Sequence, residues 1–267
     1  MSRSSTIRLA ISPCPNDTFM FDAIINHRID CQGIDVEVEY HDIEELNSCA
    51  LDHIYDITKC SAAIYRNIAK DYVLLDSGAA LGRGNGPLLV RRKGEERPLC
   101  RVAVPGLHTT ANTLLCRLFP DVKERAPRLF SEIARAVERG EYDGGVLIHE
   151  GRFVYEREHL ELVADLGVEW EQQTGLPLPL GIITAKRSLP AELIAKFESL
   201  LRESIEYAFA HPRASRDFVR SHAREMDDEV IDKHISLFVN DFSLSLGTEG
   251  RKAIDYLLGQ NEGNESR

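Results

Sequence analysis

The strongest constraint on the fold is an order of elements that occurs twice in the chain: an apolar strand, a polar loop and a helix. Residues 7–26 contain the first copy and residues 101–119 the second. The segments 34–40, 44–51 and 54–58 continue the alternation of strand, helix and strand after the first copy. Strands that alternate with helices form parallel sheets covered by helices, so the pattern predicts an α/β protein.

Two crossings are expected to divide the chain into two lobes. The charged segment 91–97 leads from the first series of elements into the second. The segment 174–181 carries prolines at alternate positions, which favours an extended return crossing over a central strand or a helix. We therefore expect a large lobe from residues 1–92 and 183–267, a small lobe from 93–182, and a ligand cleft between them. This arrangement resembles the periplasmic-binding-protein type II fold.

The loop before the first helix carries side chains that suit a helix start. Asn16, Asp17 or Thr18 could each be the N-cap of a helix over about 19–26, and Thr110 opens the helix of the second copy in the same way. Free N–H groups at such helix starts can bind an anion. Ordinary capping requires the same residue types, so neither loop decides the function alone.

Composition excludes several functional classes. The formal net charge is −11, which gives a nucleic-acid partner little electrostatic support. No stretch reaches the roughly 20 apolar residues of a membrane span. The apolar run 7–11 is too short for a signal-peptide core, so we expect a cytoplasmic protein without a membrane partner. Apolar positions on the C-terminal helices could form an interface, so a homodimer is one of the expected states.

The glycine-rich segment 77–87 does not match a nucleotide-binding fingerprint. It has neither G-x-G-x-x-G before a helix nor G-K-[ST], and the strand Leu88–Val90 follows it. A flexible binding loop and a plain turn remain equally good interpretations, because glycine serves both.

The six cysteines lack the spacing of a metal site. They form no C-x-x-C pair and no short Cys/His cluster, so neither zinc nor an iron–sulfur centre is expected. Free thiols are the expected state in a reducing compartment. Cys14 lies in the first loop, where a small packing residue is a better interpretation than a functional thiol.

One histidine stands where a buried strand is predicted to end. His149 follows the apolar run 144–148, and ligands of α/β proteins bind beyond the carboxyl ends of such strands. Imidazole can take and return a proton near neutral pH, because its ordinary pKa is about 6.5. The C-terminal histidines His211, His222 and His234 are interpreted as helix-surface or interhelix residues.

Five ordered motifs resemble those of the 1,4-dihydroxy-6-naphthoate synthase family of menaquinone biosynthesis. The likeness continues through residues 238–243 and so spans nearly the whole chain. The motifs are Ser12–Phe19 (SPCPNDTF), Gly78–Pro87 (GAALGRGNGP), Val102–Ala111 (VAVPGLHTTA), Ile148–Glu150 (IHE) and Thr174–Gly181 (TGLPLPLG).

The resemblance implies a carbon–carbon lyase without cofactor or metal. Its substrate would be cyclic dehypoxanthine futalosine, an aromatic carboxylate with a sugar-derived ring. His149 would be the general base, and Glu150 would either orient it or face solvent. The implied substrate contacts are Lys59, Cys60 and Ser61 at a first-lobe helix start, Thr110 and Ala111 at a second-lobe helix start, and Asn16, Asp17, Thr18 and Arg83 in the first two motifs.

Cys60 is a modest departure from the family pattern, and we expect backbone N–H groups to make the contact there. Two other functions remain open. The first is a cytoplasmic binding protein for a small aromatic carboxylate. The second is a chorismate-dehydratase-like enzyme, although that sister family opens with a different first loop.

Overall fold

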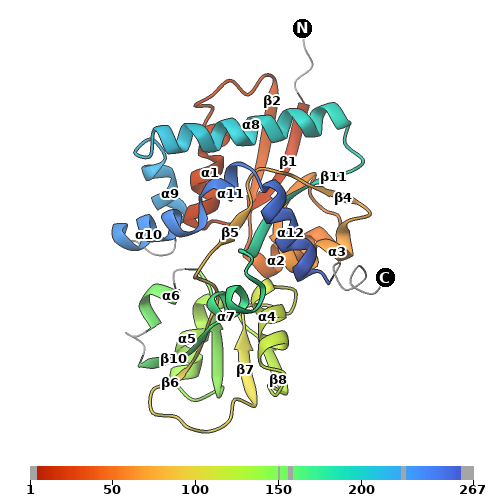
Figure 1. Cartoon of the computed structure of the whole chain (residues 1–267). Helices are drawn as coiled ribbons and strands as arrows, with labels where there is room; N and C mark the ends of the chain where they lie inside the picture. Colours follow the sequence, from red (N-terminus) through yellow and green to blue (C-terminus); the bar gives the residue numbers. More distant parts are fainter. Residues whose placement is uncertain (1–4, 150, 156–158, 224–226, 260–267) are drawn as a thin grey trace.

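The computed structural model describes residues 5–149, 151–155, 159–223 and 227–259. It contains two sheets, and Figure 1 shows that each has its own set of helices. The chain passes from the first sheet to the second and back. The predicted α/β class with two lobes is confirmed.

The first sheet has the strand order β2-β1-β3-β11-β4, with β5 paired to β11. Its strands are β1 (Ser5–Ile11), β2 (Ile34–Tyr40), β3 (Ile57–Ser61), β4 (Tyr72–Leu74), β5 (Ala80–Gly82) and β11 (Leu178–Lys186). The predicted parallel pairing is confirmed for β2, β1 and β3. It does not extend to β11, which runs antiparallel to β3, β4 and β5 because it enters after the excursion through the second sheet.

The second sheet has the strand order β10-β6-β9-β7-β8. β7 is parallel to β8 and β9, whereas β6 is antiparallel to β9 and β10. Its strands are β6 (Leu88–Arg92), β7 (Arg101–Val104), β8 (Glu124–Pro127), β9 (Gly144–Leu147) and β10 (Leu160–Asp165).

Helices surround both sheets, and α8 lies across the first sheet in Figure 1. Of the exposed large apolar side chains among the described residues, only Phe209 of α8 lies on the C-terminal helices. The helices are α1 (Pro15–Ile25), α2 (Ile43–Leu51), the 3₁₀ helix η1 (Ala62–Ile64), α3 (Tyr65–Ile68), α4 (Thr110–Leu118), α5 (Phe130–Glu138), α6 (Gly151–Val154), α7 (Leu166–Thr174), α8 (Ala191–Ala210), α9 (Arg216–His222), α10 (Asp228–Phe238), α11 (Asp241–Leu244) and α12 (Gly247–Leu257). None of the helices in the described ranges is long and apolar enough to cross a membrane.

The chain changes sheets earlier than the charge pattern predicts. β6 pairs with β9 and β10, so the first crossing falls between Gly82 and Leu88. The segment 91–97 covers the end of β6 and the turn after it, and its charges are those of a solvated turn. Assigning 1–92 and 183–267 to one lobe and 93–182 to the other stays a prediction, and the pairing favours boundaries nearer 83–87 and 175–177.

The proline-rich return segment is partly a strand. Leu178, Pro179 and Leu180 belong to β11, contrary to the expected extended crossing. Pro179 is tolerated because it lies where β11 pairs with β5 across a register irregularity, and a proline there removes no ladder hydrogen bond from the centre of the sheet. The crossing itself is short, since α7 ends at Thr174 and Gly175 adopts a left-handed conformation after it.

The first helix begins earlier than predicted. α1 starts at Pro15 with Cys14 as its N-cap, so Asn16, Asp17 and Thr18 lie in the first turn. Proline at the first helical position has a suitable φ and lacks an N–H that would have no partner there. The polar side chains of Asn16, Asp17 and Thr18 are therefore not needed for capping and can form hydrogen bonds in the interior of the protein.

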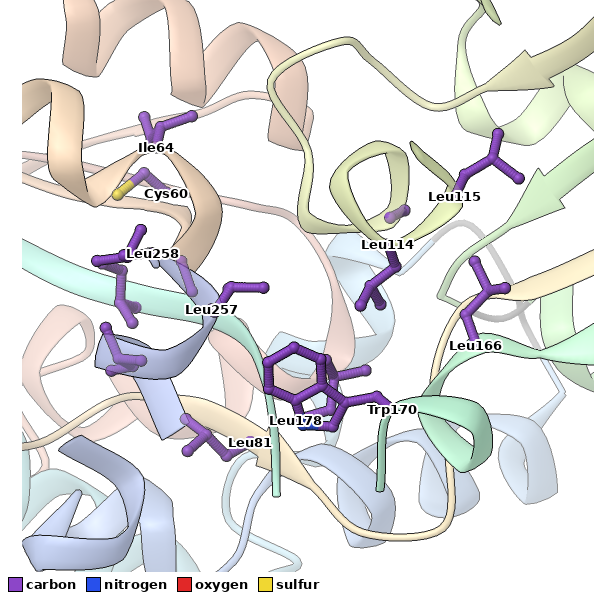
Figure 2. Packing of buried hydrophobic residues seen from close by; sticks show 14 of the residues in the cluster. Cys60, Ile64, Leu81, Leu114, Leu115, Leu166, Trp170, Leu178, Leu257 and Leu258 are labelled. Atoms are coloured by element: carbon purple, nitrogen blue, oxygen red, sulfur yellow. The ribbon is translucent and has the colours of Figure 1, made fainter. Parts of the chain in front are cut away.

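One hydrophobic cluster extends across both sheets. Trp170 of α7 is 1 % exposed, and its indole Nε1 donates to the carbonyl oxygens of Leu176 and Pro177 at 3.1 Å each. Figure 2 shows Trp170 within this cluster, between Leu81 of the first sheet and Leu114 of α4. The two lobes thus share a common core beside the crossings.

Two glycines allow the backbone to come close where the chain enters the second sheet. A Cβ atom on Gly86 would lie 2.4 Å from the nitrogen of Gly167, and one on Gly167 would lie 2.3 Å from the carbonyl oxygen of Asn85. Neither neighbour is a flexible side chain. The contact therefore requires glycine in both segments.

Replacing Gly167 with alanine should force the two backbones apart. We expect Gly167→Ala to lower the free energy of unfolding by about 3 kcal/mol, as measured by urea denaturation. Gly94→Ala is the control, because a Cβ there meets nothing within 4 Å and the strain of φ +76° costs about 1 kcal/mol. Equal losses in the two variants would contradict the close-approach argument.

Candidate active site

A pocket of about 620 Å³ lies between the two sheets and is lined by elements of both. A second hollow of about 460 Å³ adjoins it and shares Ile43, His149 and His234 with it. The larger pocket is lined by Asn16, Ile43, Lys59, Ser61, Ala80, Gly86, Pro87, Thr109, Thr110, Ala111, Ile148, His149, Arg152, Leu180, Gly181, His234 and Phe238.

His149 lies where the two hollows meet. It follows β9 and has φ +54°, a left-handed conformation that is uncommon for residues other than glycine and occurs often at functional sites. Its ring meets the edge of Phe130 at a centroid distance of 4.9 Å and stacks on His234 at 5.9 Å. The Sγ atom of Cys14 is 3.4 Å from its Nδ1.

These contacts come from different parts of the chain. Phe130 belongs to α5 beside the second sheet, whereas Cys14 caps α1 and His234 lies on α10 beside the first. The imidazole of His149 therefore extends from the second sheet and is held by residues of the first lobe.

A buried ion pair lies under the pocket. The Lys59 ammonium donates to Oδ1 of Asp17, and the two side chains are 5 % and 0 % exposed. Ser12 donates to Oδ2 of Asp17 through its hydroxyl at 2.6 Å and its backbone N–H at 3.1 Å. Asn16 donates to Oδ1 of Asp17 at 2.8 Å. The carboxylate thus has the partners that a buried charge requires.

His234 is connected to this ion pair through Asn16. Its Nε2 lies 2.9 Å from Oδ1 of Asn16. Burial lowers the pKa of His234 well below its ordinary value, and the neighbouring His149, Lys59 and Arg152, which are cationic or become so on protonation, lower it further. The ring is therefore neutral at physiological pH.

The charged side chains that line the larger pocket are both cationic. Lys59 and Arg152 face it, whereas their carboxylate partners Asp17 and Asp165 are not part of the lining. Arg152 donates to Asp165 at 3.0 Å and to the carbonyl oxygen of Gly86 at 2.9 Å. Burial lowers the pKa of Arg152, and Asp165 opposes that change. Each pair is neutral overall, but the lining itself presents the two cationic groups, which suits an anionic ligand.

The start of α4 forms another wall of the pocket. Thr109 is the N-cap and accepts from the N–H of Asn112 at 3.2 Å. The Thr110 hydroxyl donates to the carbonyl oxygen of Leu180 at 3.1 Å and accepts from the N–H of Ala63 at 3.3 Å. Thr110 thus connects α4 to β11 and η1, and the helix dipole adds to the positive potential of the pocket.

Six of the predicted site residues line the pocket together, and four do not. Those in the lining are Asn16, Lys59, Ser61, Thr110, Ala111 and His149. Asp17 and Thr18 are fully buried beneath it. The thiol of Cys60 points into the hydrophobic core, where burial raises its pKa to about 12.

Arg83 lies away from the pocket lining. It pairs with Glu171 of α7 at 2.8 Å and with Glu249 of α12, so its guanidinium connects two helices. Its side chain is 42 % exposed. Glu150, which the resemblance assigns either to orienting His149 or to facing solvent, lies outside the described residues.

The expected helix start at Lys59–Ser61 is confirmed only at Ser61, because Lys59 and Cys60 lie within a strand. These residues form the end of strand β3, and Ser61 is the N-cap of the three-residue η1, which continues into the four-residue α3. The N–H of Ser61 already donates to Oδ1 of Asn47 at 2.8 Å, so it is not available to a carboxylate. Lys59 supplies positive charge here through its ammonium instead.

Sequence reasoning missed Cys14, Arg152 and His234. The sequence favours a packing role for Cys14 and a helix-surface or interhelix position for His234, and it assigns no role to Arg152. The signal for Arg152 was its position three residues after His149. For His234 there was none, because 218 residues separate it from its partner Asn16.

The described part of the chain holds no group of three or more His, Cys, Asp or Glu side chains that could bind a metal ion.

Solved structures with the same architecture include binding proteins. The Candida albicans CA3427 gene product, described as having the generic periplasmic binding protein fold, gives a TM-score of 0.71 at 13 % identity and covers 96 % of this chain and 90 % of its own. Protein AF1704 from Archaeoglobus fulgidus gives a TM-score of 0.89 at 34 % identity, covering 95 % of this chain and 96 % of its own. The chain is thus a two-lobed α/β protein with the periplasmic-binding-protein fold, and Lys59 and Arg152 line the pocket between its lobes.

Sequence comparison identifies the family. A family model described as menaquinone biosynthesis matches residues 7–262. The chain is 45 % identical to a 1,4-dihydroxy-6-naphthoate synthase of Thermus thermophilus, over 96 % of this chain and 94 % of the relative. It is 42 % identical to the Streptomyces coelicolor protein of the same name, over 96 % and 92 %. The chain belongs to the 1,4-dihydroxy-6-naphthoate synthase family of menaquinone biosynthesis, which confirms the resemblance.

The buried neutral state of His234 should make stability depend on pH. Its pKa is lowered in the folded protein, so the unfolded chain binds more protons and stability falls as pH drops below about 6.5. Between pH 6.5 and pH 5 the wild type should lose more free energy of unfolding than His234→Phe, which has no such group. Urea denaturation across this range measures both slopes, and parallel slopes would show that His234 is charged in the folded state.

Proposed function

We propose that the protein is a carbon–carbon lyase that converts cyclic dehypoxanthine futalosine to 1,4-dihydroxy-6-naphthoate in menaquinone biosynthesis. Membership of the synthase family over 96 % of the chain supports this reaction. The observation that carries the proposal is the position of His149. Its imidazole lies at the end of a buried strand, in the pocket between the lobes that Lys59 and Arg152 also line.

We propose that His149 is the general base. It takes the proton of a hydroxyl group on the sugar-derived ring, and the hydroxyl oxygen becomes a carbonyl oxygen. The adjacent carbon–carbon bond breaks, and its electron pair passes to a ketone of the fused ring system. The resulting enolate takes the proton back from His149, so one proton and one electron pair are redistributed and no oxidant is needed. A positioned base of this kind contributes typically 10²- to 10⁴-fold to the rate.

The aryl carboxylate of the substrate suits the charge of the pocket. Lys59 and Arg152 line it from the two lobes, and the start of α4 at Thr110 and Ala111 adds the positive end of a helix dipole. The apolar side chains of Ile148 and Phe238 in the same lining suit a flat aromatic ring. We propose that these groups orient the substrate so that its sugar-derived part faces His149.

His149→Asn tests the base. Asparagine tolerates the left-handed backbone that this position requires, so the variant should fold normally. We expect kcat to fall at least about 100-fold, because the amide cannot accept the proton. Turnover is measured as release of 1,4-dihydroxy-6-naphthoate, and substrate binding by calorimetry should stay within about threefold of the wild type.

Three outcomes would contradict this function. A pure binding protein would show no turnover in the wild type either. A chorismate-dehydratase-like enzyme would instead remove water from chorismate, which mass spectrometry detects. Loss of activity on treatment with a chelator would contradict a mechanism that needs no metal.

The carboxylate site can be tested with simple ligands. We expect 2-naphthoic acid to bind about tenfold more tightly than 2-naphthamide, because only the acid carries the charge that the α4 start and the two cations favour. Competitive inhibition measures both affinities. Equal inhibition by the two compounds would show that the pocket does not recognise a carboxylate.

A further inference from the structure

The rings of His149 and His234 lie face to face across the boundary between the lobes. Their centroids are 5.9 Å apart and their planes differ by 15°. His234 is 1 % exposed and packs on Phe238 at 4.8 Å on its own helix. A cation within about 6 Å of the centroid of an aromatic ring is attracted to the face of that ring. His234 is therefore positioned to act on whichever charge His149 carries.

The buried ion pair determines which nitrogen of His234 carries its proton. The Lys59 ammonium holds the carboxylate of Asp17 in place, and this carboxylate can only accept. The Asn16 amide must then direct its Nδ2 toward Asp17 and its Oδ1 toward His234. An amide oxygen cannot donate, so Nε2 of His234 carries the proton and donates to it at 2.9 Å.

The other nitrogen of His234 is unsuited to a second proton. Its Nδ1 is buried and has no hydrogen-bond partner among the described residues. The groups that act on the ring from neighbouring elements are Lys59 of β3, Arg152 of α6 and His149 after β9. All three are cationic or become cationic on protonation. The carboxylate of Asp17 lies behind Asn16, and its charge is paired with Lys59.

We propose that His234 is a positioning residue whose permanently neutral ring supports His149 as an imidazolium forms there. This inference rests on the proposed function, in which His149 takes a proton from the substrate. A charged neighbour would repel the new imidazolium, whereas a neutral ring offers it a π face. The Lys59–Asp17–Asn16 chain thus keeps a second histidine beside the base without adding a competing charge.

The two ends of His234 then have separable effects. Its ring face contacts His149, so it affects the chemical step and kcat. Its Nε2–H holds Asn16, which lines the pocket, so it affects substrate binding and KM.

Two substitutions separate these effects. His234→Gln keeps a donor near the position of Nε2 but has no ring, and should lower kcat about tenfold with KM within about threefold. His234→Phe keeps a flat ring but no donor, and should keep kcat within about threefold while KM rises about tenfold. His211→Gln is the matched control. His211 is exposed and stacks on Tyr207 at 4.4 Å outside the pocket, so both constants should stay unchanged.

The pH profile gives a readout that a purely structural role would not move. Loss of the ring face makes protonated His149 less favourable, so the base stays unprotonated to lower pH. The acid limb of kcat/KM should therefore move to lower pH in His234→Gln and stay near the wild-type position in His234→Phe. The proposal would be overturned if His234→Gln kept both the wild-type kcat and the wild-type acid limb of kcat/KM. An equal loss of kcat in the two variants would also overturn it.

Nitrogen NMR of the wild-type imidazoles provides a test that needs neither variants nor turnover. His234 should show the Nε2–H tautomer and no titration between pH 5 and pH 8. Titration of His234 in this range would overturn the inference even if a variant failed to fold. Absence of turnover by the wild type on cyclic dehypoxanthine futalosine would instead refute the proposed function, so the two failures are distinguishable.

Discussion

The buried ion pair between Lys59 and Asp17 is the interaction on which the site depends. It joins the end of β3 to the first turn of α1, and its carboxylate also holds Ser12 and Asn16. Removing one partner of such a pair costs about 3–5 kcal/mol, because the other charge is left buried without compensation. The same pair orients the Asn16 amide and, through it, His234. One electrostatic contact thus supports both the fold and the geometry around His149.

The sequence pattern predicted most strands and helices because their apolar spacing is local. The prediction failed where one local pattern was compatible with two structures. The charges of 91–97 suited a linker, but they belong to the end of a strand and an exposed turn. Pro179 argued against a strand, yet its position beside an irregularity at the end of β11 makes its missing N–H harmless. The parallel sheet was predicted correctly only for strands joined by adjacent helices.

The site residues that could be predicted from the sequence lie where strands end and helices begin. His149 after β9 and Thr110 at the start of α4 follow from where strands stop and helices begin. Arg152 lies only three residues beyond His149, whereas Cys14 and His234 could not be assigned in this way. Their roles depend on long-range packing, as in the contact of Cys14 with His149 across 135 residues of sequence. A single sequence contains the residues of such a contact but not their pairing.

The position of β11 has a consequence for the order in which the protein can fold. This strand lies between β3 and β4 in the first sheet, but it begins at Leu178, after all five strands of the second sheet. During synthesis, the small lobe can complete its sheet while the large lobe still has a gap at its centre. The chain then presents β3 as an open edge, which is the kind of surface that pairs with other chains. Prompt arrival of β11 therefore protects the newly made chain from aggregation.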